Sequence, residues 1–542
     1  MALVRAAAVV LAFLASVVPA TATAASSRGV YPVTPAPLPR ARALDAITRS
    51  PSVLVQLTPS VAAPAALTRE GATLVSPGLR IWQLPGTTAR GLVPKLLRTG
   101  ALQAVEADQL LVPQDEFPLG DPLVPSEWWI PAVGADRAEP PGPGVPITVV
   151  DTGLDRTHPE FAARPATVTL NKQEVGAGDE AHGTAVSSVV AAPANGVGIV
   201  GIYPQARLQE WDVHDARVSD VIRGIDLAAN RGRSVINLSG GFFGPSRLLT
   251  QAVDRAIGKG SIVVAAVGND RRNGSRRLVP ASLPHVFTVA ATDTASSAAF
   301  FSSRSSALDV AAPGQDIPAA VPFADDATGF AAFDGTSFAT PLVSGAAAWV
   351  WTARPTLTNT QVLDVLRASA HDVDAPGRDK NTGWGILDLP AALAAPDPPL
   401  DPQEPNDDVY SVKPHGLFAG GARSLTGPHR PTAALQAELD STEDPEDVYR
   451  VWVPAHGRLI ATVQGDANVD LALWSVNTKT VLERGAALKR DRRDFSIQTG
   501  RRADAVSLRN RTSRAAIVYV DVFLGKRTPQ AVYTVNVTTS PH

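Results

Sequence analysis

The chain lacks cysteine altogether and holds a single methionine among its 542 residues. Disulfides, thiolate metal sites and a cysteine nucleophile are therefore excluded. The formal net charge is only -3, so a general attraction to nucleic acid or to anionic membranes is not expected. No apolar run reaches the about 20 residues that a membrane-spanning helix needs. These absences are typical of an exported soluble protein, and the length suffices for about three or four domains.

The first 24 residues have the three regions of a secretory signal. Arg5 is followed by an apolar run at residues 6–18 and then by small residues at positions 20–24. A retained membrane anchor is the alternative, but the run is too short to span a bilayer. We therefore expect residues 1–24 to be a signal peptide and the mature protein to be secreted and free of membrane after cleavage.

The next two regions both mix strands with helices. Residues 25–120 predict a small α/β module with strands at 53–57, 79–84 and 105–112 and a helix at 91–100. Residues 121–395 alternate amphipathic helices with buried strands at 147–150, 234–238, 262–267 and 286–290. That alternation predicts an α/β fold, with a mainly parallel sheet and helices on both faces.

The last region changes to strands. Residues 396–403 are rich in proline and predict a stiff linker. Residues 404–542 contain strand-like runs at 448–453, 459–463, 469–474, 516–523 and 532–537. We expect an antiparallel β-sandwich there.

Four polar residues lie where strands end or helices begin in the central region, which is where such folds collect functional groups. Asp151 follows a buried strand, His182 opens an apolar helix, Asn269 follows another strand, and Ser337 opens the apolar run that ends at Trp351. Taken singly, each has a plainer interpretation: a turn aspartate, a core histidine, a turn asparagine and a helix N-cap. Pro341 is expected in the first turn of the Ser337 helix.

The order Asp, His, Ser is the order in subtilisin, whereas chymotrypsin and the α/β-hydrolases have other orders. The flanking residues also resemble the subtilisin-like serine proteases. The matching stretches are DTGLDRTHPEF at 151–161, HGTAVSSVVAA at 182–192, VINLSGG at 235–241, GND at 268–270, AAPG at 311–314, GTSFATP at 335–341 and GWGILD at 383–388. About half of the chain is covered, and His158 remains a competitor for the histidine role.

The resemblance implies a mechanism. Ser337 would attack the peptide carbonyl, His182 would carry the proton and Asp151 would hold the imidazole in the right tautomer. Asn269 and the Ser337 backbone N–H would meet the oxyanion. Substrate would bind as an added strand, and the residues expected to contact it are Ser239, Gly240, Gly241 and Gly268. Activity should fall below the usual histidine pKa of about 6.5, since a protonated imidazole accepts no proton.

Three residues near these motifs depart from the family pattern or add a charge. Phe338 stands where methionine is common, which implies resistance to peroxide and a narrower pocket. Val267 stands where alanine is usual and should alter the pocket. Asp270 either favours basic substrates or is a solvated surface carboxylate.

The resemblance also implies partners and an optional metal. Residues 25–120 look like a propeptide that acts as an intramolecular inhibitor, with autocleavage between residues 113 and 120. No cofactor is expected for the chemistry. A structural calcium at the loop of residues 193–199, with Asn195 and Glu160, is left open. The protein is expected to be a monomer.

The C-terminal region resembles the bacterial pre-peptidase C-terminal domain through Glu404-Pro405-Asn406-Asp407. There Asp407, Asp444 and Asp447 form either a calcium site or, as the favoured interpretation, a solvated acidic edge. The sequence thus predicts a secreted serine endopeptidase, made as a zymogen and acting on proteins or peptides through an acyl-enzyme. The alternative is an inert subtilisin-like scaffold that presents the β-sandwich for binding.

Overall fold

The computed structural model describes the chain outside residues 1–51, 59–64, 78–79, 108–118, 176–177 and 542. The signal peptide and most of the expected cleavage region lie outside the described residues. The chain divides into two compact units, residues 1–113 and 114–542. Among the described residues, no helix has both the length and the apolar character that crossing a membrane requires.

The first unit is a small antiparallel sheet with the strand order β2-β3-β1-β4. Its elements are β1 (Ser52–Leu57), α2 (Ala65–Arg69), β2 (Thr73–Ser76), β3 (Ile81–Pro85), α3 (Gly86–Arg98) and β4 (Leu102–Ala107). In β1 the buried residues alternate, because one face of the strand packs on α3 and the other does not. The strands predicted at 53–57 and 79–84 and the helix are confirmed, with the helix starting five residues earlier and with α2 and β2 added. The strand predicted at 105–112 is β4, shifted to 102–107, and residues 108–112 lie outside the described residues.

The second unit is centred on a seven-stranded sheet with the order β13-β12-β10-β8-β5-β7-β6, in which every pairing is parallel. The strands are β5 (Ile147–Asp151), β6 (Thr167–Thr169), β7 (Leu208–Asp212), β8 (Val235–Leu238), β10 (Ile262–Ala266), β12 (Phe287–Thr292) and β13 (Val310–Pro313). The predicted parallel sheet is thereby confirmed.

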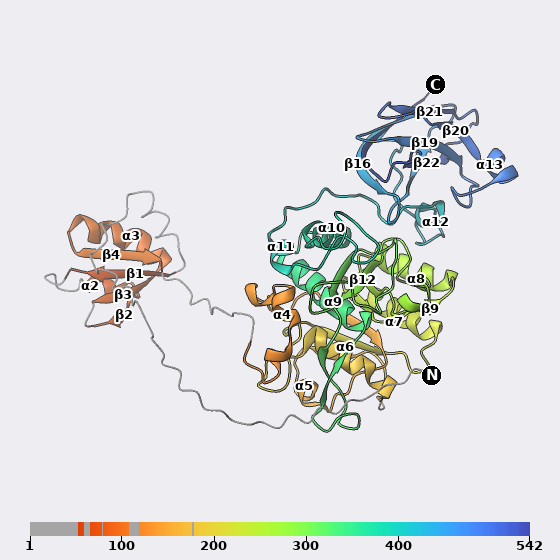
Figure 1. Ribbon diagram of the computed structural model, residues 1–542. Coiled ribbons are helices and arrows are strands. Elements are labelled where there is room, and N and C mark those ends of the chain that lie inside the picture. The colour runs from red at the N-terminus through yellow and green to blue at the C-terminus, as the bar shows by residue number, and fades with distance from the viewer. Residues whose placement is uncertain (1–51, 59–64, 78–79, 108–118, 176–177, 542) are drawn as a thin grey trace. The chain divides into compact units, whose positions relative to one another are not determined.

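Helices cover both faces of this sheet (Figure 1). One face packs on α6 (His182–Ala191), α9 (Thr336–Ala353), α10 (Asn359–Ser369) and α11 (Leu389–Ala394), and the other on α7 (Val218–Asn230) and α8 (Arg247–Gly258). Strand β10 illustrates the division: Ile262 and Val264 join the first core, while Val263 and Ala265 join the second. Because both faces are buried, these strands are continuous apolar runs.

The C-terminal part of the second unit is a sandwich of two four-stranded antiparallel sheets, as predicted, with the orders β16-β23-β18-β21 and β17-β22-β19-β20. The strands are β16 (Thr432–Asp440), β17 (Glu446–Val453), β18 (Arg458–Gly465), β19 (Val469–Ser475), β20 (Arg492–Ser496), β21 (Asp504–Arg509), β22 (Ala516–Leu524) and β23 (Gln530–Ser540). Inward-facing valines, leucines and tyrosines of both sheets form its core.

Short elements complete the second unit. They include α4 (Trp129–Ala132), α5 (Pro159–Ala162), β9 (Phe242–Phe243), β11 (Leu278–Val279), β14 (Ile317–Ala320), β15 (Phe330–Phe333), α12 (Val409–Val412) and α13 (Gly485–Asp491). The pair β9–β11 is antiparallel and lies beside the functional site described next.

Candidate active site

Three adjacent strands of the parallel sheet end at one edge and deliver polar residues there. Asp151 is the last residue of β5, Ser239 follows β8, and Asn269 comes three residues after β10. The strands β10, β8 and β5 are neighbours, so their carboxyl ends present these residues together.

His182 is the first residue of α6 and pairs with Asp151. Its Nδ1 lies 2.7 Å from Asp151 Oδ1, and the backbone N–H of Thr152 donates to the same oxygen at 2.8 Å. The Asp151 side chain is only 5% exposed, whereas that of His182 is 29% exposed. A buried carboxylate needs such donors to stay charged, and the half-open imidazole keeps access to a ligand.

Ser337 is the second residue of α9. The ring of the next residue, Phe338, has its centroid 5.7 Å from that of His182, so the imidazole lies beside the first turn of α9. The Ser337 hydroxyl donates to the backbone carbonyl of Ser239 at 2.8 Å. The structure thus brings the predicted carboxylate, imidazole and hydroxyl together at one edge of the sheet.

Pro341 is the sixth residue of α9, so the prediction that it lies in the first turn is wrong. At this position a proline removes the N–H that would bond to the carbonyl of Ser337, four residues earlier. The Ser239 hydroxyl donates to that carbonyl instead, at 2.9 Å. Two hydrogen bonds therefore join Ser239 and Ser337. Pro341 allows one of them, because it leaves the Ser337 carbonyl without a helical N–H donor.

Asn269 is exposed and has a fixed orientation. Its Oδ1 accepts from both the backbone N–H and the hydroxyl of Thr336, each at 2.9 Å. The amide nitrogen then remains as the donor end of the side chain, next to Gly335. An amide held in this way is ready to donate to a developing negative charge beside Ser337. Thr336, which the sequence did not single out, is the residue that orients it.

The predicted substrate-contacting residues lie around this group. Ser239 is buried, while Gly240 and Gly241 are exposed at the surface and continue from β8. Gly268 has a positive φ of 104°, a conformation that glycine adopts without strain. These residues provide accessible backbone near Ser337 and Asn269.

Asp270 is neither a solvated carboxylate nor an open charge for a basic substrate, so both predicted roles are wrong. It is 8% exposed and forms an ion pair with Arg276, Nε to Oδ2, at 2.6 Å. It also accepts from the side chain of Asn273 at 2.8 Å. The hydrogen bonds from Arg276 and Asn273 lower the pKa of Asp270 to about 2. The Asp270 carboxylate therefore stabilises the loop that contains Asn273 and Arg276.

Of the two substituted family positions, Val267 differs from expectation, while the expectations for Phe338 stay predictions. The Val267 side chain is buried in a small cluster with Ala290, Leu308 and Ala311, so it contributes to the core and does not shape the site. Phe338 is 3% exposed and stacks on Phe333 with ring centroids 4.8 Å apart. It fills space beside His182.

His158 does not compete for a chemical role. It is fully buried, its Nδ1 accepts from the backbone N–H of Glu160 at 3.2 Å, and its Nε2 lies 3.0 Å from the Gly329 carbonyl. Burial lowers its pKa, which keeps the ring neutral. His158 is a structural residue that caps α5.

The loop at residues 193–199 does not fit a calcium ion well. The Asn195 amide donates to Glu160 Oε2 at 3.2 Å, and Glu160 Oε1 accepts the Ile199 N–H at 3.0 Å. Asp121 accepts the N–H groups of Asn195 and Gly196. The polar atoms of the loop thus satisfy one another, and no bare oxygen calls for a cation.

A different group of carboxylates does contain buried oxygens without hydrogen-bond partners. We use the name acidic cluster for Asp401, Glu404, Asn406, Asp407, Asp444 and Asp447. Within the described part of the chain, one carboxylate oxygen each of Asp401 and Asp444 is buried and accepts no hydrogen bond. Glu404 and Asn406 contact Asp447 through side-chain hydrogen bonds. Burial and then the neighbouring carboxylates raise the pKa of Glu404 and of Asp444 well above the usual range.

The acidic cluster converges on two points. One is surrounded by ligand atoms of His285, Asp407 and Asp444, and the other by those of Asp401, Asp444 and Asp447, in each case within 4.8 Å of one another. Asp447 is fully buried and Asp444 is 9% exposed. The favoured prediction of a solvated acidic edge is therefore wrong.

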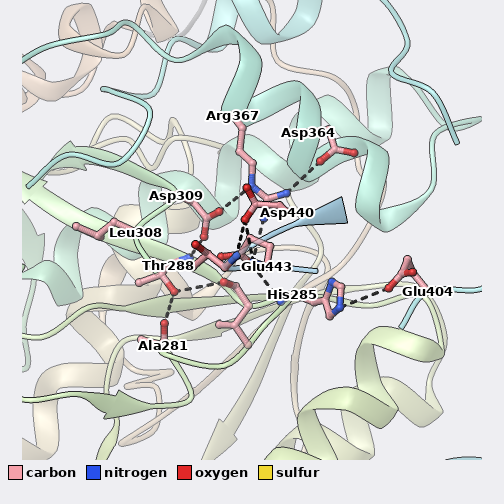
Figure 2. Close-up of polar contacts among 12 residues, drawn as sticks. Ala281, His285, Thr288, Leu308, Asp309, Asp364, Arg367, Glu404, Asp440 and Glu443 are labelled. Carbon is pink, nitrogen blue, oxygen red and sulfur yellow. Dashed lines mark hydrogen bonds and ion pairs between the residues drawn. The ribbon is translucent and has the colours of Figure 1, made fainter. Parts of the chain in front are cut away.

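Glu404 of the acidic cluster faces His285, and Glu443 of the sandwich lies beside Arg367 of α10 (Figure 2). His285, from the loop before β12, has its Nε2 3.0 Å from Asp407 and 3.4 Å from Glu404. Burial alone would lower the pKa of His285, but Asp407 and Glu443 outweigh it and raise the pKa to about 9. The imidazolium is thus the cation nearest to the acidic cluster.

The region where the sandwich meets α10 and the loop before β12 is called the junction, and it also contains two arginines. Arg367 of α10 donates to the buried carboxylate of Asp309 at 2.7 Å and lies 3.6 Å from Glu443 of the sandwich. Arg378 lies 3.5 Å from Asp440 and 3.4 Å from Glu443. A cavity of about 770 Å³ lies beside these residues, lined by α10, the linker and strands β16 and β23. Sequence reasoning missed the junction, because its partners are far apart in the chain.

A parallel sheet that carries a carboxylate–imidazole pair and a helix-borne serine at its carboxyl edge defines the class of serine hydrolases. The model of the subtilase family, peptidase S8, matches residues 142–385. The subtilisin of Bacillus pumilus is 36% identical over 258 residues, which cover 46% of this chain and 91% of that protein. The chain belongs to the subtilase family of serine endopeptidases.

Two other proteins are also similar to this chain. Subtilisin amylosacchariticus of Bacillus subtilis subsp. amylosacchariticus is 36% identical over 258 residues, and the chain spans 66% of its length. Among solved structures, fervidolysin from Fervidobacterium pennivorans, a keratinolytic enzyme related to subtilisin, is similar with 19% identity and a TM-score of 0.47. That similarity covers 84% of each chain.

Proposed function

We propose that the protein is a secreted serine endopeptidase that hydrolyses proteins and peptides through Asp151, His182 and Ser337. The observation that carries this proposal is the 2.7 Å contact between Asp151 and His182 beside the first turn of the Ser337 helix. An inert scaffold needs none of these groups in register, so the arrangement argues against the alternative. The pre-peptidase resemblance of the sandwich remains a prediction.

The proposed reaction begins with a rotation of the Ser337 side chain. The hydroxyl turns from the Ser239 carbonyl to His182, which accepts its proton as the oxygen bonds to the substrate carbonyl carbon. His182 then passes the proton to the leaving amine as the C–N bond breaks. Water hydrolyses the resulting ester by the same route. Asp151 keeps the Nδ1 proton in place throughout.

The remaining contacts bind substrate and charge. The oxyanion is met by the Asn269 amide and by the Ser337 N–H, one of the first N–H groups of α9, which have no intrahelical partner. The Ser239 carbonyl, once released by the Ser337 hydroxyl, accepts a backbone N–H of the substrate. Residues Ser239, Gly240 and Gly241 then pair with the substrate as an extended strand, and Gly268 allows its close approach.

The protein is proposed to be made as a precursor. Residues 1–24 would direct export, and residues 25–120 would fold with the enzyme and inhibit it until they are removed by self-cleavage. The compact antiparallel sheet of residues 52–107 supports this role because it folds around a core of its own. No cofactor takes part in the proposed chemistry.

The function is tested by comparing the purified wild type with Ser337→Ala, on gels and by casein hydrolysis with and without a serine-directed phosphonate. We expect the wild type to lose the N-terminal unit and to digest casein, and the variant to do neither. If both proteins stay full length and inert, the scaffold alternative replaces the proposal.

We also propose a structural calcium ion at the acidic cluster. Five buried or half-buried carboxylates and one amide supply oxygen ligands of the kind calcium prefers, and the bare oxygens of Asp401 and Asp444 are the observation that supports it. Without a calcium ion, His285 compensates part of the charge through its contacts with Asp407 and Glu404. The ion would fix the sandwich against the loop before β12.

Calcium binding is tested by melting the Ser337→Ala protein with a chelator and with calcium added. A ligand at 100 times its Kd stabilises a fold by about 2.7 kcal/mol, so the melting temperature should rise by several degrees. In Asp444→Asn the chelated protein should melt at least as high as its parent and no longer respond to calcium. The exposed carboxylate of Asp215 offers the control, Asp215→Asn. A response that survives Asp444→Asn contradicts the proposal.

A further inference from the structure

Leu278 of β11 lies between two glycines assigned to substrate binding. A Cβ atom built on Gly268 would lie 2.5 Å from Leu278 Cδ1. A Cβ atom built on Gly241 would lie 3.3 Å from Leu278 Cβ and 3.0 Å from the Val279 carbonyl oxygen. The leucine side chain therefore fills the space that the absent side chains of both glycines leave.

The position of Leu278 is fixed from two directions. Strand β11 pairs with β9, and Leu278 is opposite Phe243. Arg276, two residues earlier, forms the ion pair with Asp270 and lies over the Phe243 ring at 3.9 Å from its centroid. These contacts fix the backbone at Leu278, and the leucine side chain is half-buried.

The proposed reaction directs one substrate side chain toward this residue. The carbonyl under attack must lie between Ser337 and Asn269, and the N–H of the same substrate residue, P1, pairs with the Ser239 carbonyl. The P1 side chain must then enter the glycine-lined space between the segments 239–241 and 267–269. Leu278 already occupies part of that space.

Other side chains near the site do not control this space. Val267 is buried in the core, Phe338 stacks on Phe333, and Asp270 is held by Arg276. The size of the P1 side chain therefore depends mainly on residue 278.

We propose that Leu278 restricts the P1 position of substrates to small side chains, chiefly alanine, and excludes aromatic ones. The inference rests on the proposed endopeptidase function and names the substrate class of the same site. Shape discrimination of this kind in an apolar pocket is worth about 10–200-fold per methylene-sized mismatch.

The experiment measures kcat/KM for three peptide anilides, succinyl-Ala-Ala-Pro-X-p-nitroanilide with X as Ala, Leu or Phe. The wild type is expected to cleave the Ala peptide at least about tenfold more efficiently than the Phe peptide. Leu278→Ala should raise kcat/KM for Phe by at least about tenfold and leave that for Ala within about threefold. Leu278→Gly should raise kcat/KM for the Phe peptide further. Leu248→Ala is the matched control, because that leucine is 68% exposed on α8.

Each outcome has a separate meaning. A wild type that cleaves the Phe peptide as well as the Ala peptide overturns the inference but keeps the endopeptidase function. The inference also fails if Leu278→Ala leaves the Ala-to-Phe ratio where the Leu248→Ala control leaves it. A wild type that is folded but neither processes itself nor cleaves casein or any of the three peptides overturns the proposed function and the inference with it.

Discussion

The active site and the acidic cluster are both built on buried carboxylates, but only one of them is complete within the chain. Asp151 receives hydrogen bonds from His182 and from the Thr152 N–H. Asp444, by contrast, has a buried carboxylate oxygen that accepts no hydrogen bond. Because an unpaired buried charge is costly, the second arrangement needs protons or a cation, while the first has the donors for its carboxylate within the chain.

An Asp→Asn substitution at each site should separate the roles of the two sites, with the larger effect on kcat at the active site. Asp151→Asn leaves the shape of the side chain but cannot hold the imidazole in its reactive tautomer, so kcat should fall by about 10⁴-fold. Steady-state hydrolysis of the Ala peptide measures it, and circular dichroism checks the fold. A loss of less than tenfold would show that Asp151 does not orient the base.

Asn269→Asp should have the next largest effect. The new side chain keeps an acceptor for Thr336 but loses the N–H donor and places a negative charge near the oxyanion. Turnover should fall by at least about 10²–10³-fold, a range established for an oxyanion asparagine in a subtilisin, while KM changes little. Asn230→Leu, at the end of α7, is the control. A change confined to KM would assign Asn269 to substrate binding alone.

Asp447→Asn is the counterpart in the acidic cluster. It removes one negative ligand, so calcium affinity measured by titration calorimetry should fall by at least about tenfold, with kcat unchanged. Loss of kcat with normal calcium affinity would erase the contrast between the two sites.

Glu127→Gln should have the smallest effect, visible only as a pH dependence. Burial raises the pKa of Glu127 to about 8, although the Val200 N–H donates to it. The folded protein thus holds a proton that the unfolded chain releases above its pKa of about 4.3, so stability falls as pH rises between these values.

Glutamine keeps an acceptor for Val200 and cannot ionise. In the Ser337→Ala background, the wild-type residue should therefore lose about 3.5 kcal/mol more stability than glutamine between pH 5 and pH 8. Denaturant unfolding at the two pH values measures the difference. Parallel pH profiles for the two proteins would show that Glu127 keeps its proton affinity on unfolding.

The central strands and the four polar residues were predictable because their signals are local. A strand buried on both faces is a continuous apolar run, and its end marks the edge where Asp151 and Asn269 lie. Strand β7 was missed because it is polar: its Glu210 is fully buried and accepts a hydrogen bond from Ser187. Edge strand β6, with only three residues, gave no run at all.

Contacts between distant segments could not be predicted from one sequence. The link from Pro341 through the Ser337 carbonyl to Ser239 joins positions 98 residues apart, and His285 meets Asp407 across 122 residues. Leu278 is similar, since nothing in its neighbours along the chain indicates that it lies between two glycines. Such residues became visible only when the strands were paired.

The most direct test of the central claim is to map the residue that a biotinylated serine-directed phosphonate labels in the processed protein. Mass spectrometry of the digested protein should find one labelled peptide, modified at Ser337, and labelling should be lost in His182→Ala. A label on another serine, or casein hydrolysis that continues in fully labelled protein, would contradict the assignment of Ser337 as the nucleophile.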